Sequence, residues 1–427
     1  MRILGIETSC DESAVCLIEA SGTFDASFQF NVLGNALISQ IAVHAPYGGV
    51  FPNLAKREHS RNLVPLLQQV FDQSSTPRGS TSGGNPGGST SRDEDLDLRQ
   101  ILEREPEMLD QLEIFLKTHG KPEIDVIAVT HGPGLEPALW VGVNFARALS
   151  IIWNMPIVPV NHLEGHIAMA AINTGSSQHS NILQNVGMSG GLQTFDFPAI
   201  ALVISGGHTE LDLVREWPMF KTIGETRDDA VGEAFDKVAR MMGLPYPGGP
   251  EISRLAARAR IIADQTQIVA DRNLRKSASN LRTSASLPRP MIHDLNFDFS
   301  FSGLKTAVLR LIKDLKLTEQ EKGEIASEFE DAAADVLVTK TMRAVEEYGA
   351  QTVLVGGGVS ANTHIKSELK KALDERGIAL LYPPPGFETD NALMIALAGY
   401  FHARNKEFAD PSTLRANGNL RLEQTLT

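Results

Sequence analysis

Short apolar runs separated by polar turns predict two similar β-hairpins. The first has strand-like runs over residues 3–8 and 14–18 on either side of a polar turn. The second repeats this order, with apolar runs over residues 199–205 and 211–214 around the turn Gly206–Thr209. The repetition indicates that one fold is duplicated within the chain, which also accounts for its 427 residues.

Other segments predict strands that alternate with helices. The run I-D-V-I-A-V-T at residues 124–130 is typical of a buried parallel strand. A glycine-rich turn, a helix over residues 136–153 and a strand over residues 156–160 complete a βαβ unit. Strands over residues 352–355 and 378–381 each precede a turn rich in glycine or proline. This pattern predicts an α/β protein.

We expect two lobes. The N-terminal lobe covers residues 1–157, with a C-terminal helix over residues 394–427 packing back on it, and the C-terminal lobe covers residues 158–393. Two stretches rich in Ser, Gly, Thr, Asn and Pro interrupt the pattern. The stretch at about residues 74–95 predicts a disordered insertion, and the stretch at residues 173–196 predicts a surface loop.

Composition narrows the class of protein. The content of 42% hydrophobic and 21% charged residues is that of a globular protein, and no apolar run predicts a membrane span. The net charge of −13 argues against a broad polyanion-binding surface but leaves room for a local basic groove. With only Cys10 and Cys16, no disulfide framework is expected. We expect a cytoplasmic protein.

The stretch N-H-L-E-G-H at residues 161–166 carries the first candidate chemistry. If this stretch is helical, His162 and His166 lie one turn apart on the same face. Two imidazoles at that spacing can bind one divalent metal ion. The alternative is a pair of ordinary polar residues on a half-exposed helix.

Three glycine-rich turns follow apolar segments, at residues 205–207, 248–249 and 356–360. Glycine lets backbone N–H groups approach a phosphate, although tight turns also use glycine for purely steric reasons. None of the three is a Walker loop or a dinucleotide fingerprint. Together with the two hairpins, they suggest a duplicated actin-like ATPase or sugar-kinase (RNase H-like) fold, with a nucleotide and metal cleft between two lobes.

Motifs in a fixed order make a more specific resemblance. The chain resembles the tRNA N6-adenosine threonylcarbamoyltransferase family, formerly described as glycoproteases, over almost its whole length. The matching motifs are E-T-S-C-D-E-S (7–13), Y-G-G-V-F-P-N-L-A-K-R-E-H (47–59), G-P-G-L (132–135), N-H-L-E-G-H (161–166), S-G-G-H-T (205–209), G-E-T-R-D-D-A-V-G-E-A-F-D-K (224–237), F-S-F-S-G-L-K-T (299–306), G-G-V-S-A-N (357–362) and T-D-N-A (389–392).

The resemblance implies a reaction and a metal. Members of the family transfer the threonylcarbamoyl group from threonylcarbamoyl-AMP to N6 of the adenosine beside the anticodon in ANN-decoding tRNAs, and AMP leaves. By analogy, His162, His166 and Asp390 hold one divalent metal, iron(II) or zinc, which acts as a Lewis acid. ATP or ADP can occupy the same cleft.

The resemblance also implies substrate and catalytic residues. Asp11 is expected to position a group or transfer a proton, and His208 to lie beside the phosphate or carbonyl. Asp236 has an alternative role as a cap or ion-pair partner on its helix, and Asn362 an alternative role as an N-cap. The family's substrate positions map onto Val203, Ile204, Ser205, Gly206, Gly207, Asp236, Gly249 and Asn362.

Three other functions remain to be weighed. A metalloprotease would carry H-E-x-x-H, but this chain has Leu163 after His162, and Glu164 comes one place later. A small-molecule kinase or another carbamoyltransferase of the same fold has no need of the paired histidines with Thr389-Asp390. A non-catalytic actin-like binding module would typically lose the metal ligands.

The expected partners follow from the family. They are tRNA, an inactive paralogue and a small ATPase, or a second copy of the chain in a homodimer, and no membrane is expected. The candidates for contact with tRNA phosphates are Lys56, Arg57, Arg61, Arg275, Lys276 and Arg282. The alternative is that they are ordinary solvated surface charges.

Overall fold

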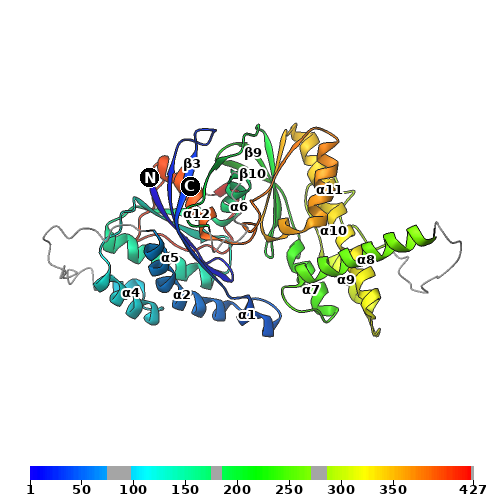
Figure 1. Cartoon of the computed structure of the whole chain (residues 1–427), viewed down its shortest axis with the longest axis horizontal. Helices are drawn as coiled ribbons and strands as arrows, with labels where there is room; N and C mark the ends of the chain where they lie inside the picture. Colours follow the sequence, from blue (N-terminus) through cyan, green and yellow to red (C-terminus); the bar gives the residue numbers. More distant parts are fainter. Residues whose placement is uncertain (75–97, 175–184, 271–285, 425–427) are drawn as a thin grey trace. The chain divides into compact units, whose positions relative to one another are not determined.

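The computed structural model describes residues 1–74, 98–174, 185–270 and 286–424. The chain divides into two compact units, each a mixed α/β arrangement around one sheet (Figure 1). The first unit comprises residues 1–44, 50–194 and 382–427, and the second comprises residues 45–49 and 195–381. The boundary expected at residue 157 therefore lies inside the first unit. No helix in the described ranges is both long and apolar enough to span a bilayer.

The first unit is built on a sheet of seven strands in the order β5-β4-β1-β2-β3-β7-β6. Strands β1 to β3 form an antiparallel meander, while β4 and β5 run parallel to β1. The strands are β1 (Arg2–Glu7), β2 (Glu12–Ser21), β3 (Gln29–Ser39), β4 (Val126–Gly132), β5 (Ile157–Asn161), β6 (Ile172–Asn173) and β7 (Ser189–Leu192).

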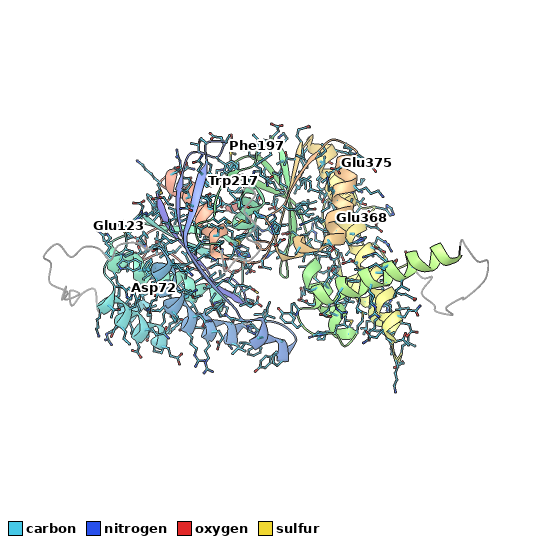
Figure 2. The ribbon with its side chains drawn as sticks, viewed as in Figure 1. Asp72, Glu123, Phe197, Trp217, Glu368 and Glu375 are labelled. Carbon is cyan, nitrogen blue, oxygen red and sulfur yellow. The ribbon has the colours of Figure 1, made fainter. Side chains whose placement is uncertain are left out.

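Helices cover both faces of this sheet. Because successive side chains of a strand point to opposite faces, Leu4 and Ile6 of β1 join the core under α2, α4 and α5, whereas Gly5 faces α12. Figure 1 shows α2, α4 and α5 gathered together. Charged side chains such as Asp72 and Glu123 lie on the outside of this unit (Figure 2). The helices are α1 (Ile41–His44), α2 (Pro52–Gln73), α4 (Pro106–Thr118), α5 (Glu136–Trp153), α6 (His162–Ala170) and α12 (Ala392–Arg404), with a 3₁₀ turn η5 (Leu422–Gln424).

Glycines allow α12 to lie unusually close to the sheet. A Cβ on Gly5 would lie 2.4 Å from the carbonyl oxygen of Ala392, and one on Gly399 would lie 2.4 Å from Cβ of Ala128. The face of β1 that carries Gly5 also carries Glu7, two residues on. The strand therefore delivers Glu7 to the side of the sheet on which α12 begins.

We predict that Gly5→Ala destabilises the first unit by about 1–3 kcal/mol, because the added methyl group overpacks the contact between β1 and α12. Gly120→Ala is the matched control, since a Cβ there meets nothing within 4 Å. Chemical denaturation monitored by circular dichroism measures the difference. Equal midpoints for the two variants would contradict the close packing.

The second unit has a five-stranded sheet in the order β10-β9-β8-β11-β12. Its longest helix, α10, begins with a capping box in which Thr318 and Glu321 bond reciprocally. The elements are η1 (Ala45–Tyr47), β8 (Ala199–Ile204), β9 (Thr209–Glu216), β10 (Met219–Glu225), α7 (Val231–Met241), α8 (Gly248–Ala270), α9 (Ser302–Ile312), α10 (Glu319–Tyr348), β11 (Thr352–Gly356), η4 (Gly358–Ala361), α11 (Thr363–Asp374) and β12 (Ala379–Leu381).

The two sheets repeat one local plan. In the first unit, β1 pairs antiparallel with β2 and parallel with β4. In the second, β8 pairs antiparallel with β9 and parallel with β11. The predicted α/β class and the two similar hairpins are confirmed, and the shared pairing supports the predicted duplication.

Two sequence expectations differ from the structure. Residues 173–196 were expected to be a loop, but β6 and β7 pair with each other, and β7 extends the sheet beside β3. The C-terminal helix packs on the first unit's sheet but ends at Arg404, because Lys406 adopts a positive φ of 61°, which a right-handed helix does not allow. The expected insertion at 74–95 lies almost entirely outside the described residues.

Candidate metal centre and substrate residues

The helix that carries the two histidines starts directly at the end of β5. Asn161 caps it, since its Oδ1 accepts a hydrogen bond of 2.9 Å from the backbone N–H of Leu163. The side-chain Nδ2 of Asn161 donates a hydrogen bond of 3.2 Å to the carbonyl oxygen of Arg421. His162 and His166 therefore leave the first two turns of α6 from one face, with ring centroids 4.7 Å apart.

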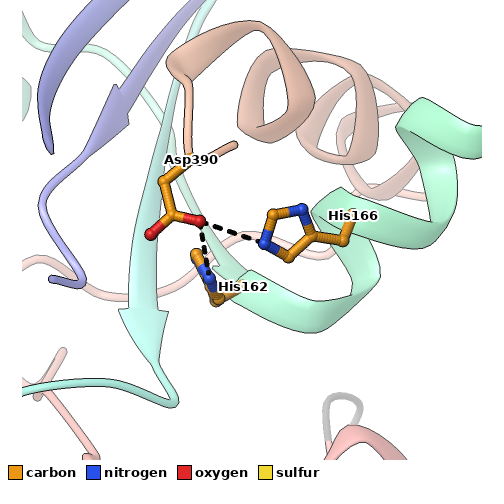
Figure 3. Close-up of side chains that lie close together, drawn as sticks. All are labelled: His162, His166 and Asp390. Atoms are coloured by element: carbon orange, nitrogen blue, oxygen red, sulfur yellow. Dashed lines mark ion pairs between the residues drawn. The ribbon is translucent and has the colours of Figure 1, made fainter. Parts of the chain in front are cut away.

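Asp390 completes a three-residue cluster from a distant part of the chain (Figure 3). Its Oδ1 lies 3.4 Å from Nε2 of His162 and 3.1 Å from Nε2 of His166. The next residue, Asn391, caps α12 by accepting from the backbone N–H of Met394 at 3.0 Å, which fixes the backbone beside Asp390. One potential ligand atom from each of the three residues lies within 4.8 Å of the others.

The charges of this cluster are strongly coupled. Burial on its own lowers the pKa of His162, but the carboxylates of Asp390 and Glu7 outweigh it and raise that pKa to about 10. Burial opposes ionisation of Asp390 as well, yet His162 and His166 hold its pKa well below the usual range. Burial lowers the pKa of His166. The cluster thus combines a positively charged His162 and a neutral His166 with the carboxylates of Asp390 and Glu7.

The donor set fits a divalent metal. Two imidazoles and one carboxylate are ligands that zinc and iron accept, and three protein ligands leave positions open for a substrate. His166 is fully buried; its Nε2 faces Oδ1 of Asp390 at 3.1 Å without hydrogen-bond geometry, and its Nδ1 has no hydrogen-bond partner among the described residues. A buried imidazole without such a partner is costly unless a ligand that is not part of the chain satisfies it.

Glu7 is a functional residue that motif reasoning did not single out. Its carboxylate is fully buried and accepts from Nδ1 of His162 at 3.3 Å, from the hydroxyl of Thr130 at 2.5 Å and from the backbone N–H of Ser9 at 2.5 Å. A carboxylate on Nδ1 fixes the ring and leaves Nε2 as the metal-binding atom. The only signal in the sequence was an acidic residue at the end of an otherwise apolar strand.

We predict that Glu7→Gln weakens metal binding by about 10- to 100-fold, because the amide is a poorer partner for Nδ1 of His162. Isothermal titration with Zn²⁺ measures the change. Glu19→Gln, at the exposed end of the same hairpin, is the control. Unchanged affinity in Glu7→Gln would show that Glu7 only supports the fold.

Glu164 lies between the two histidines in sequence but serves a different purpose. Its carboxylate is fully buried and contacts Nε2 of His402 at 2.8 Å. A metalloprotease base must reach a water molecule on the metal. The pairing with His402 confirms that Glu164 is engaged in the protein interior.

The His402 pair predicts a pH-dependent stability. Burial lowers the pKa of His402, but Glu164 and Glu407 outweigh it and raise that pKa to about 9. The folded state therefore holds a proton that the unfolded state releases near pH 6.5, so the stabilisation is complete below pH 6.5 and is lost as the pH rises to 9. Between pH 6.5 and 9, we expect the free energy of unfolding of the wild-type protein to fall by on the order of 3 kcal/mol more than that of His402→Gln, with both proteins treated with a chelator. Urea denaturation at several pH values measures this difference. The same pH dependence of the free energy of unfolding in both proteins would rule out this proton.

The tip of the first hairpin places Asp11 near the metal cluster. Burial and the charge of Asp390 both raise the pKa of the Asp11 carboxyl. A buried network supports the tip, in which Ser13 Oγ lies 2.8 Å from Nδ1 of His59 and Nε2 of His59 lies 3.0 Å from the carbonyl of Cys10. Because that carbonyl can only accept, His59 carries its proton on Nε2 and accepts from Ser13.

In the second unit, the tip of the other hairpin meets two further elements. Ser205 Oγ accepts from the backbone N–H of His208 at 3.0 Å, and its carbonyl accepts from Gly232 at the start of α7 at 3.2 Å. Gly357, with φ of 89°, passes so close that a Cβ would lie 2.4 Å from the carbonyl of Ile204. The hairpin tip, the start of α7 and the G-G-G turn therefore converge.

The substrate residues expected in this unit differ in how accessible they are. Val203 and Ile204 are fully buried, so only their backbone is available to a ligand. Gly206 and Gly207 are open, since a Cβ on either meets nothing within 4 Å. Gly249 is open in the same sense.

Asn362 fills the N-cap role considered as its alternative, whereas the hydrogen bond of Asp236 reaches a different helix from its own, α8. Asp236 accepts from the backbone N–H of Gly248 at 2.7 Å and so holds the start of α8. Asn362 accepts from two N–H groups of α11 and donates at 2.9 Å to Ser253 Oγ and at 2.7 Å to Glu330. These four bonds use the hydrogen-bonding capacity of the Asn362 side chain, so it builds the turn rather than presenting a free amide.

Two of the basic residues considered for tRNA contact form ion pairs. Lys56 lies 3.2 Å from Glu105, and Arg61 lies 2.9 Å from Glu107. Arg275, Lys276 and Arg282 fall outside the described residues. A role in tRNA contact stays a prediction for all of them.

Comparison with known proteins agrees with the motifs. A model of the family "tRNA N6-adenosine threonylcarbamoyltransferase" matches residues 31–79 and 102–397. The enzyme of that name from Burkholderia ambifaria is 38% identical over 406 residues, which cover 93% of this chain and 91% of the relative. The one from Persephonella marina is 35% identical over 427 residues, covering 99% and 96%.

A solved structure, HypF of T. kodakarensis, aligns with 72% of this chain and 44% of its own at a TM-score of 0.41 and 12% identity, too low to add to the argument. The family match and the two relatives each cover most of the chain. This chain belongs to the tRNA N6-adenosine threonylcarbamoyltransferase family.

Proposed function

We propose that this chain transfers the threonylcarbamoyl group from threonylcarbamoyl-AMP to N6 of the adenosine beside the anticodon in ANN-decoding tRNAs, releasing AMP. The family match over most of the chain carries this proposal. The observation from the structure that supports it best is the cluster of His162, His166 and Asp390 on two elements far apart in sequence.

His162, His166 and Asp390 are the proposed ligands of one divalent metal, with iron(II) favoured over zinc. When bound there, the metal supplies Lewis acidity that polarises the acyl carbonyl. Glu7 orients His162 through Nδ1, and Asn391 holds the backbone beside Asp390.

In the transfer, the N6 amine forms a bond to the acyl carbon, the bond from that carbon to the phosphate oxygen breaks, and AMP leaves with the electron pair. The amine must also lose a proton. We assign Asp11 to this amine, because burial and the charge of Asp390 raise the pKa of its carboxyl, which makes the carboxylate a stronger proton acceptor. His208 is proposed to contact the phosphate or carbonyl.

The second unit is proposed to bind the adenylate. The open hairpin tip at Gly206 and Gly207, beside the start of α7, leaves room for the phosphate, and the backbone N–H of Gly206 is the proposed donor to it, because the N–H groups of Ser205 and Gly207 bond to the His208 carbonyl and to Ser205 Oγ. Gly249 leaves room for the adenosine. Asp236 and Asn362 shape this surface by holding α8 and α11, and Val203 and Ile204 contribute through their backbone.

Partners and compartment complete the proposal. The substrate is tRNA, and an inactive paralogue and a small ATPase, or a second copy of this chain, are the proposed assembly partners. We place the enzyme in the cytoplasm, where its tRNA substrate resides. A metalloprotease is disfavoured, because the carboxylate nearest in sequence to the histidines, Glu164, is buried against His402.

The test uses purified protein with threonylcarbamoyl-AMP and an ANN-decoding tRNA transcript, with the proposed partners added. Nucleoside mass spectrometry of the digested tRNA is expected to show N6-threonylcarbamoyladenosine. A matched transcript with guanosine in place of the target adenosine is the control. A product level no higher than in that control would refute the proposed reaction.

A further inference from the structure

A buried negative charge lies within the helix that carries both histidine ligands. Glu164 follows His162 by two residues and precedes His166 by two, so at about 100° per residue it leaves α6 on the side away from them. Its side chain is fully buried. A carboxylate in such a place is costly unless it is paired and hydrogen-bonded.

The partner of Glu164 comes from the last turn of α12. Nε2 of His402 lies 2.8 Å from one carboxylate oxygen of Glu164 and 2.9 Å from the other. Nδ1 of the same ring contacts the carboxylate of Glu407. His402 is itself buried, and the two carboxylates raise its pKa to about 9, so it carries a positive charge at neutral pH. The three residues form an acid–base–acid chain in which Glu164 and His402 are buried and Glu407 is partly exposed.

This chain of contacts links the two parts of the metal cluster. Helix α6 carries His162 and His166, whereas α12 starts at Ala392, two residues after Asp390. The helices also touch near the ligands, because a Cβ on Gly165 would lie 3.0 Å from Ile395 Cδ1 and 3.1 Å from Met394 Cγ. The helices therefore meet at two places, the close approach at Gly165 and the ion pair between Glu164 and His402.

We propose that His402 is a positioning residue of the metal centre, which, by pairing with Glu164, fixes α6 against α12 and so sets the spacing of His162, His166 and Asp390. The inference rests on the metal site of the proposed function. His402 does not touch a metal ligand itself. Its effect is on the geometry that the three ligands present to a metal ion.

Metal binding is sensitive to such positioning, since mutation of residues that orient metal ligands typically lowers metal affinity by about 10- to 100-fold. We expect His402→Gln to weaken Co²⁺ binding by about 10-fold or more and to change the visible absorption of bound Co²⁺. In Glu164→Gln/His402→Gln, two amides replace the charged pair and can still bond, so part of the lost affinity is expected to return.

Titration of chelator-treated full-length protein with Co²⁺, followed by absorption spectroscopy, tests this directly. Glu105→Gln is the matched control: Glu105 is also a buried carboxylate of the first unit, 2% exposed, but it pairs with Lys56 and Asn144. We expect this variant to keep the wild-type affinity and spectrum. His162→Ala identifies the site, because it removes a proposed ligand.

The outcomes separate the two claims. If His162→Ala abolishes Co²⁺ binding but His402→Gln binds with wild-type affinity and spectrum, the positioning role is wrong and the metal site stands. An equal loss in Glu105→Gln would also overturn the positioning role, because general destabilisation would then explain it.

If the wild type binds no Co²⁺, or if His162→Ala binds normally, the metal site fails and the inference fails with it. If His402→Gln does not fold, the double variant decides: it is expected to bind Co²⁺ more weakly than the wild type, and wild-type affinity and spectrum there would show that the charged pair does not set the geometry of the ligands.

Discussion

Replacing Asp390 by asparagine is expected to abolish stoichiometric metal binding and the transfer reaction together. Asparagine keeps the shape of the side chain but removes the negative charge that lies 3.1 Å from His166 and 3.4 Å from His162. The loss should exceed the roughly 10- to 100-fold that changes outside the ligand set produce. Metal analysis of the purified variant and nucleoside mass spectrometry of treated tRNA give the two readouts.

Asp410→Asn is a suitable control for this experiment. Asp410 lies in the same unit and is exposed, where it accepts hydrogen bonds from Ser412. This variant should retain both metal and activity. Full metal content in Asp390→Asn would remove Asp390 from the ligand set, and full activity without metal would separate the cluster from the reaction.

The second large effect is expected from Asp11→Asn, which should lower the single-turnover rate by about 10²- to 10⁴-fold, the range for loss of a general acid or base. The amide cannot accept the proton that the attacking amine releases. Asp11 is 8% exposed, and the charge of Asp390 raises its pKa, but Asp11 is not one of the three proposed metal ligands. Metal content should therefore stay at the wild-type level.

Rapid-quench measurement with saturating threonylcarbamoyl-AMP and tRNA isolates the chemical step. Asp25→Asn, an exposed change at another turn of the same sheet, is the control. A rate within about threefold of wild type would exclude proton transfer by Asp11. A loss of metal in the variant would instead point to a structural role at the cluster.

The sequence predicted the parts of this fold that local patterns determine. The two hairpins follow from apolar runs around polar tips, and the spacing of His162 and His166 predicted one helical face. Asp390 came from the family resemblance alone, because no local pattern links it to residues more than two hundred positions earlier. The structure brings it within 3.4 Å of both histidines.

What the sequence did not predict depends on long-range contacts. The short strand β7 is rich in glycine and serine, and it gains its structure by pairing with β3 and β6. Glu7 and His402 gain their significance only when β1, α6 and α12 come together. The saturated side chain of Asn362 likewise requires Ser253 and Glu330 to be in place.

A metal titration of the reaction itself tests whether the cluster of His162, His166 and Asp390 holds a metal that the transfer requires. Chelator-treated protein is loaded with increasing equivalents of Fe²⁺ or Zn²⁺, and the yield of N6-threonylcarbamoyladenosine is measured in a single turnover. We expect the yield to rise in proportion to the metal and to level off at one equivalent per chain, with no rise in the Asp390→Asn variant. Full yield from the metal-free protein, or an equal response in the variant, would contradict this expectation.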